Sequence, residues 1–425
     1  MITPSFSLTA TERVLPRLAL DFTTASLDPR VTFTRAGNTA TVVNSSGLVA
    51  PINADLPRFD YDPLTLICKG LLIEESRANL CLYSQDFRNT TDAGATRPWN
   101  YTNITLSADS TAAPDSTTTA DTIIETEATG AHRNFQSFTL SNATAYTFSV
   151  FAKAKERTRI AIISSDGVTA RGTGFNLSNG TSFSVGLTSP TSGSITNYGN
   201  GWYKCSITYT TGGTACNFQI YLVDNSNQTS YAGDGSSGAY VWGAQLEAGS
   251  FATSYIPTEA SQVTRTADVA TMTGTNFSDW YNQSEGTFTS RYTPSMTSAA
   301  ANIIRGPVIV DGGSFNESIN IGVLSGQNGM RVYDGGAELV NMLKGTISAN
   351  VNYQIAGAYK LNDYAVAVNG GAVTTDTSAT VPTPDRLAIG RYVTGGTFFS
   401  GLVQNIMYWP MRLTNAEVQA FSKQG

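Results

Sequence analysis

Alternation of apolar and polar residues with a period of two recurs in several stretches of this chain and constrains its fold more than any other feature. In YTFSVF, for example, Tyr146, Phe148 and Val150 occupy every second position. Successive side chains of a strand point to opposite faces, so this period is typical of a half-buried strand. Further strand signals follow at 159–163, 174–177, 203–209 and 218–223, separated by Gly, Asn and Ser turns. Many short strands without a helical period predict an all-β fold of two tandem antiparallel sandwiches.

The stretch 240–257 predicts where the first sandwich ends. Its first half places Tyr240, Trp242, Ala244 and Leu246 on one face of a strand. Its second half ends at Pro257, which cannot donate a hydrogen bond to a neighbouring strand. We therefore predict an N-terminal segment at 1–84 with short strands, a sandwich at 85–258 and a second sandwich at 259–425. The second sandwich is predicted to close with a short helix that begins at the capping box of Thr414 and Glu417.

The composition narrows the classes of partner. Charged residues make up 14% of the 425 residues and the formal net charge is −6. No cluster of Lys and Arg is present, so nucleic acid is not an expected partner. No run of 18 apolar residues occurs, so we expect no membrane insertion. The polar residues are mostly Ser, Thr, Gly and Asn, which suits neutral polar ligands.

Several segments resemble proteins of bacteriophage particles. The run PRFDYDPLTLICKGLLIEESRANLCLYSQDF at 57–87 is similar to the segment that opens many phage tail-fibre and head-spike proteins. Four further segments match, in order, the carbohydrate-binding jelly rolls of such proteins: ADTIIETEATGAH, YTFSVFAKAKERTRIAI, GNGWYKCSITYT and SYAGDGSSGAYVWGAQLEAGSFATSYIPT. The end of the chain, FFSGLVQNIMYWPMRLTNAEVQAFSKQG, resembles the closing of concanavalin A-like (laminin G-like) domains.

The resemblance implies a function and a location. It implies a non-catalytic head-spike or tail-fibre protein, made in the bacterial cytoplasm and displayed on the virion, that binds polysaccharide on the host surface. Its N-terminal segment would link to other virion structural proteins, and such proteins commonly act as multimers. Two alternatives stay open: a capsule or exopolysaccharide depolymerase, and a structural decoration protein that binds no glycan.

No catalytic residue is predicted. His132 is the only histidine, so a Ser-His-Asp triad would depend on it, and a packed or loop-bonding role is favoured. Glu125 and Glu127 lie two residues apart, hence about 7 Å apart on one face of a strand. That separation suits an inverting glycosidase, but no supporting residues accompany the pair. The acidic strand of concanavalin A-like hydrolases, of the type Glu-x-Asp-x-Glu, does not occur at 259–425.

A structural calcium ion is the one cofactor that the resemblance suggests. Jelly-roll modules often hold Ca²⁺ with six to eight oxygen ligands. The resemblance would place ligands at Asp121 and Glu247, and the loop at 231–235 offers Asp234. The alternative is that all three are hydrogen-bonded acids of turns or strand edges.

A sugar-binding platform requires aromatic rings beside amides, hydroxyls and a few charges. The alternation places Trp202 and Lys204 on the outward face of one strand, and Tyr221 and Gln219 on the outward face of the next. These four residues are predicted to form the platform. Alternatively, both residues are structural: Trp202 packs into the end of the sandwich, and Tyr221 packs at a sheet edge. Trp99 and Tyr101 are further candidate contacts.

Overall fold

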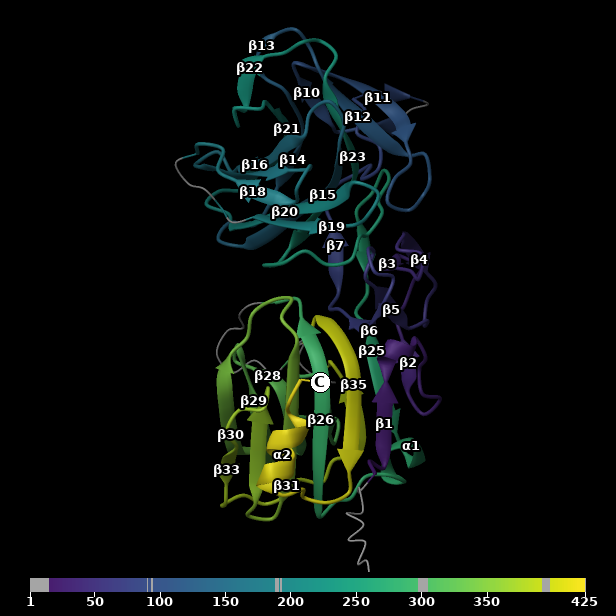
Figure 1. Cartoon of the computed structure of the whole chain (residues 1–425), viewed down its shortest axis with the longest axis vertical. Coiled ribbons are helices and arrows are strands. Elements are labelled where there is room, and N and C mark those ends of the chain that lie inside the picture. The colour runs from purple at the N-terminus through teal and green to yellow at the C-terminus, as the bar shows by residue number, and fades with distance from the viewer. Residues whose placement is uncertain are drawn as a thin grey trace, which may run out of the picture.

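The fold consists of two antiparallel β-sandwiches stacked along the long axis of the molecule (Figure 1). A computed structural model describes residues 15–89, 91–92, 95–187, 191, 193–296, 305–391 and 398–424. Nearly all regular structure in these residues is strand. The predicted fold class, all-β with tandem antiparallel sandwiches, is confirmed.

The first sandwich has two sheets of six strands. We call the sheet that faces the second sandwich the inner sheet and the other the outer sheet. The inner sheet runs β11(Ile104–Thr111), β12(Ala120–Glu125), β23(Gly238–Ala248), β15(Ala145–Ala154), β20(Trp202–Thr210), β19(Gly193–Asn197). The outer sheet runs β10(Asn100–Thr102), β14(Arg133–Thr139), β21(Ala215–Val223), β16(Arg159–Ser165), β17(Ala170–Asn176), β18(Thr181–Phe183).

The period-two pattern correctly predicts which face of β20 and β21 enters the core. Tyr203, Cys205, Ile207 and Tyr209 are buried in the core of the first sandwich. Phe218, Ile220 and Leu222 meet them from the outer sheet. The polar residues between them therefore point away from the core.

Strand β23 departs from the predicted alternation. Gly243 has a φ of +64°, and the pairing of β15 with β23 shifts register between Ser149 and Phe151. This β-bulge changes the face on which the side chains lie. Val241, Ala244 and Leu246 therefore enter the core, whereas Trp242 and Tyr240 lie on the opposite face. The prediction that Trp242 shares a face with Ala244 is wrong.

The second sandwich is built from an eight-stranded and a seven-stranded sheet. The first runs β33(Thr374–Asp376), β32(Tyr364–Val368), β31(Tyr353–Lys360), β26(Glu285–Pro294), β35(Gly401–Trp409), β6(Cys68–Ile73), β5(Arg58–Tyr61), with β1(Leu18–Asp21) also paired to β35. The second runs β2(Thr32–Thr34), β25(Val269–Thr273), β34(Arg386–Ile389), β27(Val308–Asp311), β28(Ser318–Leu324), β29(Gln327–Asp334), β30(Ala337–Thr346).

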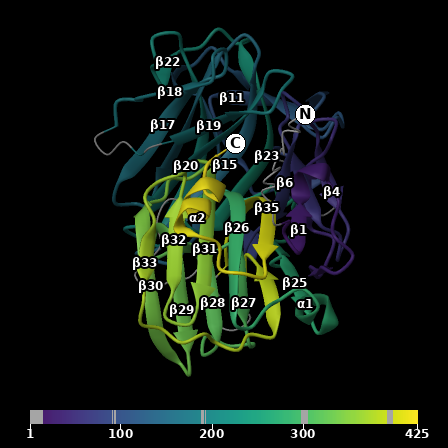
Figure 2. The same ribbon diagram turned by 60° about the horizontal axis from the view of Figure 1, so that its bottom comes forward.

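The N-terminal segment departs from the predicted division at residue 84, because its strands complete the second sandwich. Leu18 pairs with Tyr408, Phe33 pairs with Ala270, and Leu71 pairs with Val403. Leu18, Phe33 and Leu71 are buried in the same core as the later strands. Figures 1 and 2 show β1 and β6 running beside β35. A fragment at 259–425 would therefore lack strands from both of its sheets.

Short elements complete the fold. The small two-stranded sheets are β3(Ala40–Val43) with β4(Val49–Ile52), β7(Arg77–Asn79) with β24(Val263–Arg265), β13(Thr129–Ala131) with β22(Ser230–Ala232), and β8(Thr91–Asp92) with β9(Ala95–Thr96). The helices are η1(Phe22–Thr24), α1(Thr275–Ser278) and α2(Asn415–Phe421).

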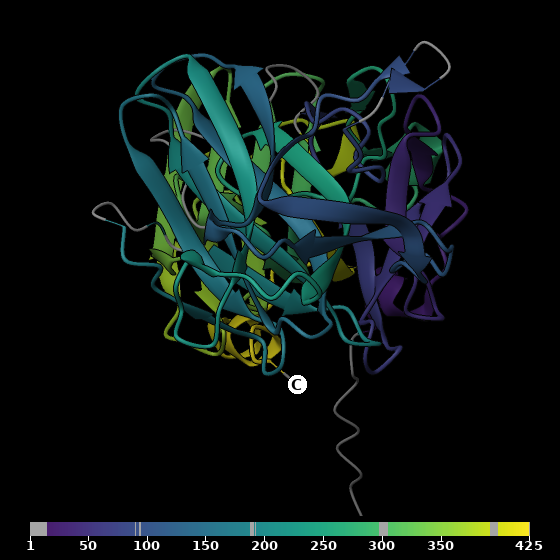
Figure 3. The ribbon, with the colours of Figure 1, turned by 90° about the horizontal axis from the view of Figure 1, so that it is seen from above.

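Helix α2 begins at the predicted capping box of Thr414 and Glu417. Across the described ranges, no helix has the length and apolar character needed to cross a bilayer. Seen from above in Figure 3, the first sandwich lies over the second, and the N-terminal strands stand at one side.

Candidate functional site

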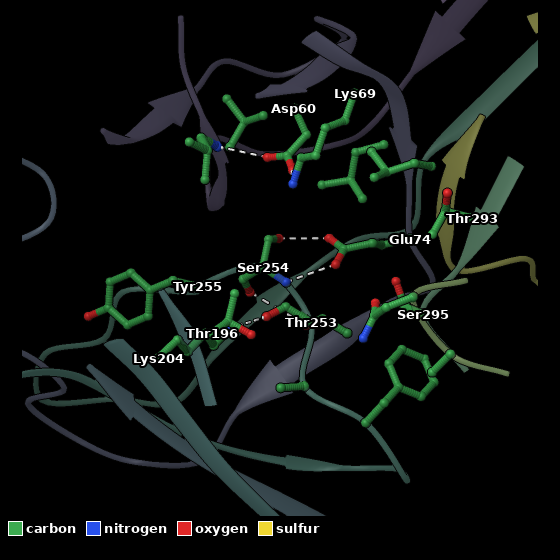
Figure 4. Close-up of a pocket in the computed structure, with 18 of the residues that line it drawn as sticks. Asp60, Lys69, Glu74, Thr196, Lys204, Thr253, Ser254, Tyr255, Thr293 and Ser295 are labelled. Carbon is green, nitrogen blue, oxygen red and sulfur yellow. Dashed lines mark hydrogen bonds and ion pairs between the residues drawn. The ribbon is translucent and has the colours of Figure 1, made fainter. Parts of the chain in front are cut away.

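A large cavity lies between the two sandwiches, and we call it the inter-sandwich cleft. Its volume is about 1160 Å³. The inner sheet of the first sandwich forms one wall through β19 and β20. The ends of β26 and β35, with residues 349–352, form the opposite wall, and β3, β5, β6 and residues 250–255 form the side. Figure 4 shows residues from all three parts around the same space.

The wall from the first sandwich carries the outward side chains of β20 and its neighbour β19. Tyr198, which directly follows β19, lines the same wall, and the strand side chains are four hydroxyls and one lysine: Ser194, Thr196, Lys204, Ser206 and Thr208. They line the cleft because their odd-numbered neighbours on β20 fill the core. Phe151 lies behind them and packs edge-to-face against Tyr198, with ring centroids 4.9 Å apart.

The opposite wall carries polar atoms that have no partner in the described part of the chain. The Nε2 of Gln404 donates to Thr293 Oγ1 at 3.1 Å, but its Oε1 is buried without a hydrogen bond. Asn352 Oδ1 and Arg291 Nε are buried and unpaired as well. A buried polar atom without a partner costs free energy. These three atoms on one wall can each still form a hydrogen bond with a ligand or with water.

A closed group of five charged residues lies directly beneath the cleft, and we call it the junction cluster: Arg35, Arg58, Glu74, Arg265 and Asp268. Arg58 bonds Glu74 at 2.6 Å and also contacts Asp268. Arg265 approaches Glu74 to 2.9 Å, and Arg35 approaches Asp268 to 3.2 Å. All five side chains are buried. Three of them belong to the N-terminal segment, and Arg265 and Asp268 lie just before β25, so the cluster ties the N-terminal strands to the start of β25.

The linker between the sandwiches is hydrogen-bonded to this cluster. Ser254 donates its backbone N–H to Glu74 Oε1 at 2.8 Å and its hydroxyl to Oε2 at 2.7 Å. Thr253 donates its N–H and its hydroxyl to the two oxygens of Glu247 on β23. Lys204 Nζ donates to the carbonyl oxygen of Thr253 at 2.6 Å. The linker therefore connects the cleft wall of the first sandwich to the junction cluster.

Burial has different net effects on the ionisation of Glu74 and of Lys204. Burial opposes the ionisation of Glu74, but Arg265 and Arg58 outweigh it and hold its pKa well below the ordinary value. Burial lowers the pKa of Lys204, and the attraction of Glu247 offsets this only in part. Glu74 is thus stabilised as an anion by its neighbours, whereas Lys204 is less stabilised as a cation.

The structure does not bring the predicted sugar platform together. Trp202 and Lys204 lie on the inner sheet, whereas Tyr221 and Gln219 lie on the outer sheet. Trp202 is 2% exposed, packs with Phe151, Trp242 and Tyr255, and donates Nε1–H to Ala112 O. Its ring is therefore packed among other side chains and does not present an open face. Of the four, Lys204 alone lines the cleft.

Tyr221 and Gln219 form a separate group on the outer sheet. Arg133 donates to Gln219 Oε1 at 2.5 Å and to the Tyr221 hydroxyl at 2.8 Å. Tyr221 is 7% exposed and packs with Ile163 and Phe183. Its ring is covered by protein and does not present a flat open surface.

Trp99 and Tyr101 lie away from the cleft and have structural contacts. Trp99 is fully buried, packs against Phe87 with ring centroids 4.6 Å apart, and donates to Tyr83 O. The Tyr101 hydroxyl donates to Phe87 O at 2.9 Å. Both residues hold the start of the first sandwich to its outer sheet.

The predicted calcium ligands lie apart from one another, and each already accepts hydrogen bonds. Asp121 accepts the N–H groups of Phe87 and Asp109, and its burial raises its pKa to about 6. Asp234 accepts from Ser236 and Ser237, and Glu247 accepts from Thr253. In the described residues, no three His, Cys, Asp or Glu side chains are grouped for a metal ion. Calcium binding stays a prediction.

The acid–base candidates are held in structural contacts. Glu125 is bonded by Arg157 through two nitrogens, at 2.7 and 2.5 Å, and by the Tyr231 hydroxyl. Burial opposes its ionisation, but the bonds from Arg157 lower its pKa overall. Glu127 is exposed. His132 is buried between the carbonyl oxygens of Asn103 and Tyr231. These residues tie β12, β13 and β22 together at the far end of the first sandwich.

Sequence reasoning missed the cleft because its residues come from three distant parts of the chain. Thr196, Arg291 and Gln404 each occupy an outward strand position, where polar residues are ordinary. The only local signal was the outward Lys204 on β20, which the alternation did identify.

No protein-family model matches the sequence, and no curated protein matches it. Solved structures match parts of it. The CBM40 of the Ruminococcus gnavus IT-sialidase bound to α2,3-sialyllactose matches with 16% identity and a TM-score of 0.30, over 35% of this chain and 87% of that one. Domain 4 of the Geobacillus stearothermophilus arabinanase AbnA, in complex with arabinotriose, matches with 11% identity and a TM-score of 0.30, over 37% and 73%. The Streptococcus pneumoniae NanB sialidase matches with 15% identity and a TM-score of 0.29, over 35% and 26%. These likenesses do not identify a family for this chain.

Proposed function

We propose that this chain is a non-catalytic glycan-binding protein of a phage or phage-like particle, and that it binds host surface polysaccharide in the inter-sandwich cleft. The observation that carries the proposal is the lining of this cleft. Hydroxyl and amide side chains from both sandwiches surround one cavity of about 1160 Å³. Polar groups of this kind hydrogen-bond sugar hydroxyls, and nearby aromatic rings contact the apolar face of a sugar ring.

The particle location is supported by the resemblance of five ordered segments to phage head-spike and tail-fibre proteins. In this proposal the chain acts as a multimer that is linked to other virion structural proteins. Several copies on one particle raise the overall affinity by effective concentration, so each cleft needs only weak binding.

A depolymerase is less well supported, because the buried acids beside the cleft are engaged. Asp60 accepts the Val43 N–H at 3.0 Å and pairs with Lys69 at 2.6 Å. Glu74 belongs to the junction cluster. A measurement of reducing ends after incubation with bacterial capsule checks this point: steady release by the wild-type chain would establish an enzyme.

The test uses the full chain and an array of bacterial surface polysaccharides. Thr196 is an exposed residue of the cleft wall, so Thr196→Trp fills the cleft without entering a core. The matched control is Thr139→Trp, at an exposed position of the outer sheet. The proposal predicts retention of the wild type and of the control, and loss of retention for Thr196→Trp. Equal retention of both variants would place the glycan elsewhere, and no retention of the wild type would contradict glycan binding.

A further inference from the structure

Resting on the glycan-binding function proposed above, we infer that the ligand of the inter-sandwich cleft is an acidic polysaccharide whose carboxylate is bound by Arg291 and Lys204. These two cations stand on opposite walls of the same cavity. Arg291 comes from β26 of the second sandwich and Lys204 from β20 of the first.

Arg291 is a guanidinium without an acidic partner among the described residues. Its backbone N–H donates to Asn405 Oδ1 at 3.0 Å, so the backbone of β26 is held in place at this residue. Its Nε is buried and has no acceptor. A guanidinium presents several N–H donors in a plane and binds a carboxylate through two of them. An arginine that is held by its backbone and free at its side chain is prepared for such a ligand.

Lys204 is likewise without an acid in direct contact. Its ammonium group has three donors, of which one reaches Thr253 O at 2.6 Å. It also lies 5.7 Å from the centre of the Phe151 ring, a weak attraction for a cation. A partly buried cation that lacks a counter-ion is costly. A ligand carboxylate would supply that counter-ion.

The acids of the cleft do not supply it, because they are already engaged. Asp60 pairs with Lys69, and Glu74 pairs with Arg58 and Arg265. At the rim, Asp21 accepts the N–H and the hydroxyl of Thr23. The two walls are thus left with positive groups that face the cavity.

The unpaired acceptors on the same wall indicate what else the ligand carries. Asn352 Oδ1 and Gln404 Oε1 each need a donor, and a sugar hydroxyl is one. A ligand that offers hydroxyl donors together with a carboxylate is a polysaccharide of uronic or other carboxylated sugars.

The test measures retention of the full chain on immobilised polymers. The carboxylated polymers are polygalacturonate, alginate, hyaluronan and polysialic acid, each printed beside its carboxyl-reduced form. Dextran and mannan represent neutral polymers, and dextran sulfate represents other polyanions. The variants are Arg291→Gln, Arg291→Lys, and the control Arg159→Gln. Arg159 lies on the outer sheet, where it bonds Asn225 at 3.0 Å.

We expect retention on at least one carboxylated polymer and its loss on the reduced form. Arg291→Gln should weaken binding about tenfold or more, as expected for loss of a hydrogen bond to a charged group. Arg291→Lys should fall between that variant and the wild type, and Arg159→Gln should bind normally. The melting temperature should be the same for all four proteins.

Two results would overturn the inference and leave the proposed function standing. One is retention on neutral or reduced polymers that Arg291→Gln does not change but Thr196→Trp abolishes. The other is equal retention on dextran sulfate, which would show a general polyanion site. Absence of wild-type retention on every polymer would contradict the glycan-binding function itself.

Discussion

Two groups of charged side chains meet where the sandwiches join, and they differ in how they are partnered. In the junction cluster, each arginine contacts an acid, and Glu74 accepts bonds from the linker as well. In the cleft beside it, Lys204 and Arg291 have no such acid in the described residues. The same kinds of charged side chain are thus paired with acids in one group and unpaired with acids in the other.

The difference separates a structural role from a binding role. A buried charge that contacts an opposite charge fixes the geometry around it, and removing one of the two is strongly destabilising. A buried charge without a counter-ion costs free energy in the free protein, and a ligand of opposite charge relieves that cost. The junction cluster therefore holds the cleft walls in place, and the cleft cations bind what enters.

The largest expected effect comes from breaking the junction cluster. Burial opposes the charge on Arg58, but Asp268 and Glu74 outweigh it and raise its pKa. Arg58→Met should lower the free energy of unfolding by about 3–5 kcal/mol, because two buried acids lose a partner. The control Arg30→Met breaks a half-exposed pair with Asp28 and should cost about 1 kcal/mol or less. Denaturant unfolding measures both, and similar losses would contradict the distinction.

Trp202 tests whether the wall behind the cleft is structural. Trp202→Ala should cost about 3 kcal/mol or more, as for other large truncations of buried residues. Tyr221→Ala, on the outer sheet, should cost less and leave glycan binding unchanged, because Tyr221 does not reach the cleft. Loss of glycan binding in Tyr221→Ala with a normal melting temperature would move the site to the outer sheet.

A bound calcium ion would change the comparison between the junction cluster and the cleft, because Glu247 is hydrogen-bonded to the same linker as the junction cluster. If Ca²⁺ binds at Asp121 or Glu247, a hundredfold excess over its dissociation constant adds about 2.7 kcal/mol to the free energy of unfolding. Melting curves of the full chain with Ca²⁺ and with chelator check this prediction. Identical melting curves would contradict the prediction of a stabilising calcium ion.

Lys204 gives the smallest effect on stability. Lys204→Met should unfold within about 1 kcal/mol of the wild type at pH 7, because the loss of one hydrogen bond is offset by the removal of a partly desolvated charge. Burial lowers the pKa of Lys204 in the folded state. The penalty for its charge is therefore full at low pH and is relieved as pH rises through the folded pKa. Urea unfolding at pH 7 and pH 10 should show that the free energy of unfolding of the wild type rises relative to that of Lys204→Met. A fall with increasing pH would contradict the burial argument.

The sequence predicted what depends on neighbouring residues. The buried faces of β20 and β21 follow from strict alternation, and the capping box at Thr414 marks the start of α2. The alternation fails on β23, because Gly243 adopts a positive φ and forms a bulge that no count of apolar residues reveals. Such a bulge depends on the pairing of β23 with β15.

Long-range pairing is the other limit. Leu18 lies beside Tyr408, and no local pattern connects two strands so far apart in the chain. The cleft depends on the same pairings, since Arg291 and Gln404 line one cavity with Lys204 only when the sandwiches are stacked. A predicted outward residue is therefore a candidate for binding only after the structure shows what it faces.

The central claim is that one ligand site uses both sandwiches. Hydrogen–deuterium exchange of the full chain, with and without a polysaccharide that it retains, tests this most directly. The account predicts slower exchange on bound polysaccharide in β19 and the start of β20 and, in the same experiment, at residues 291–294 and 402–405. Protection confined to one sandwich, or found at β14 and β21 of the outer sheet instead, would contradict it.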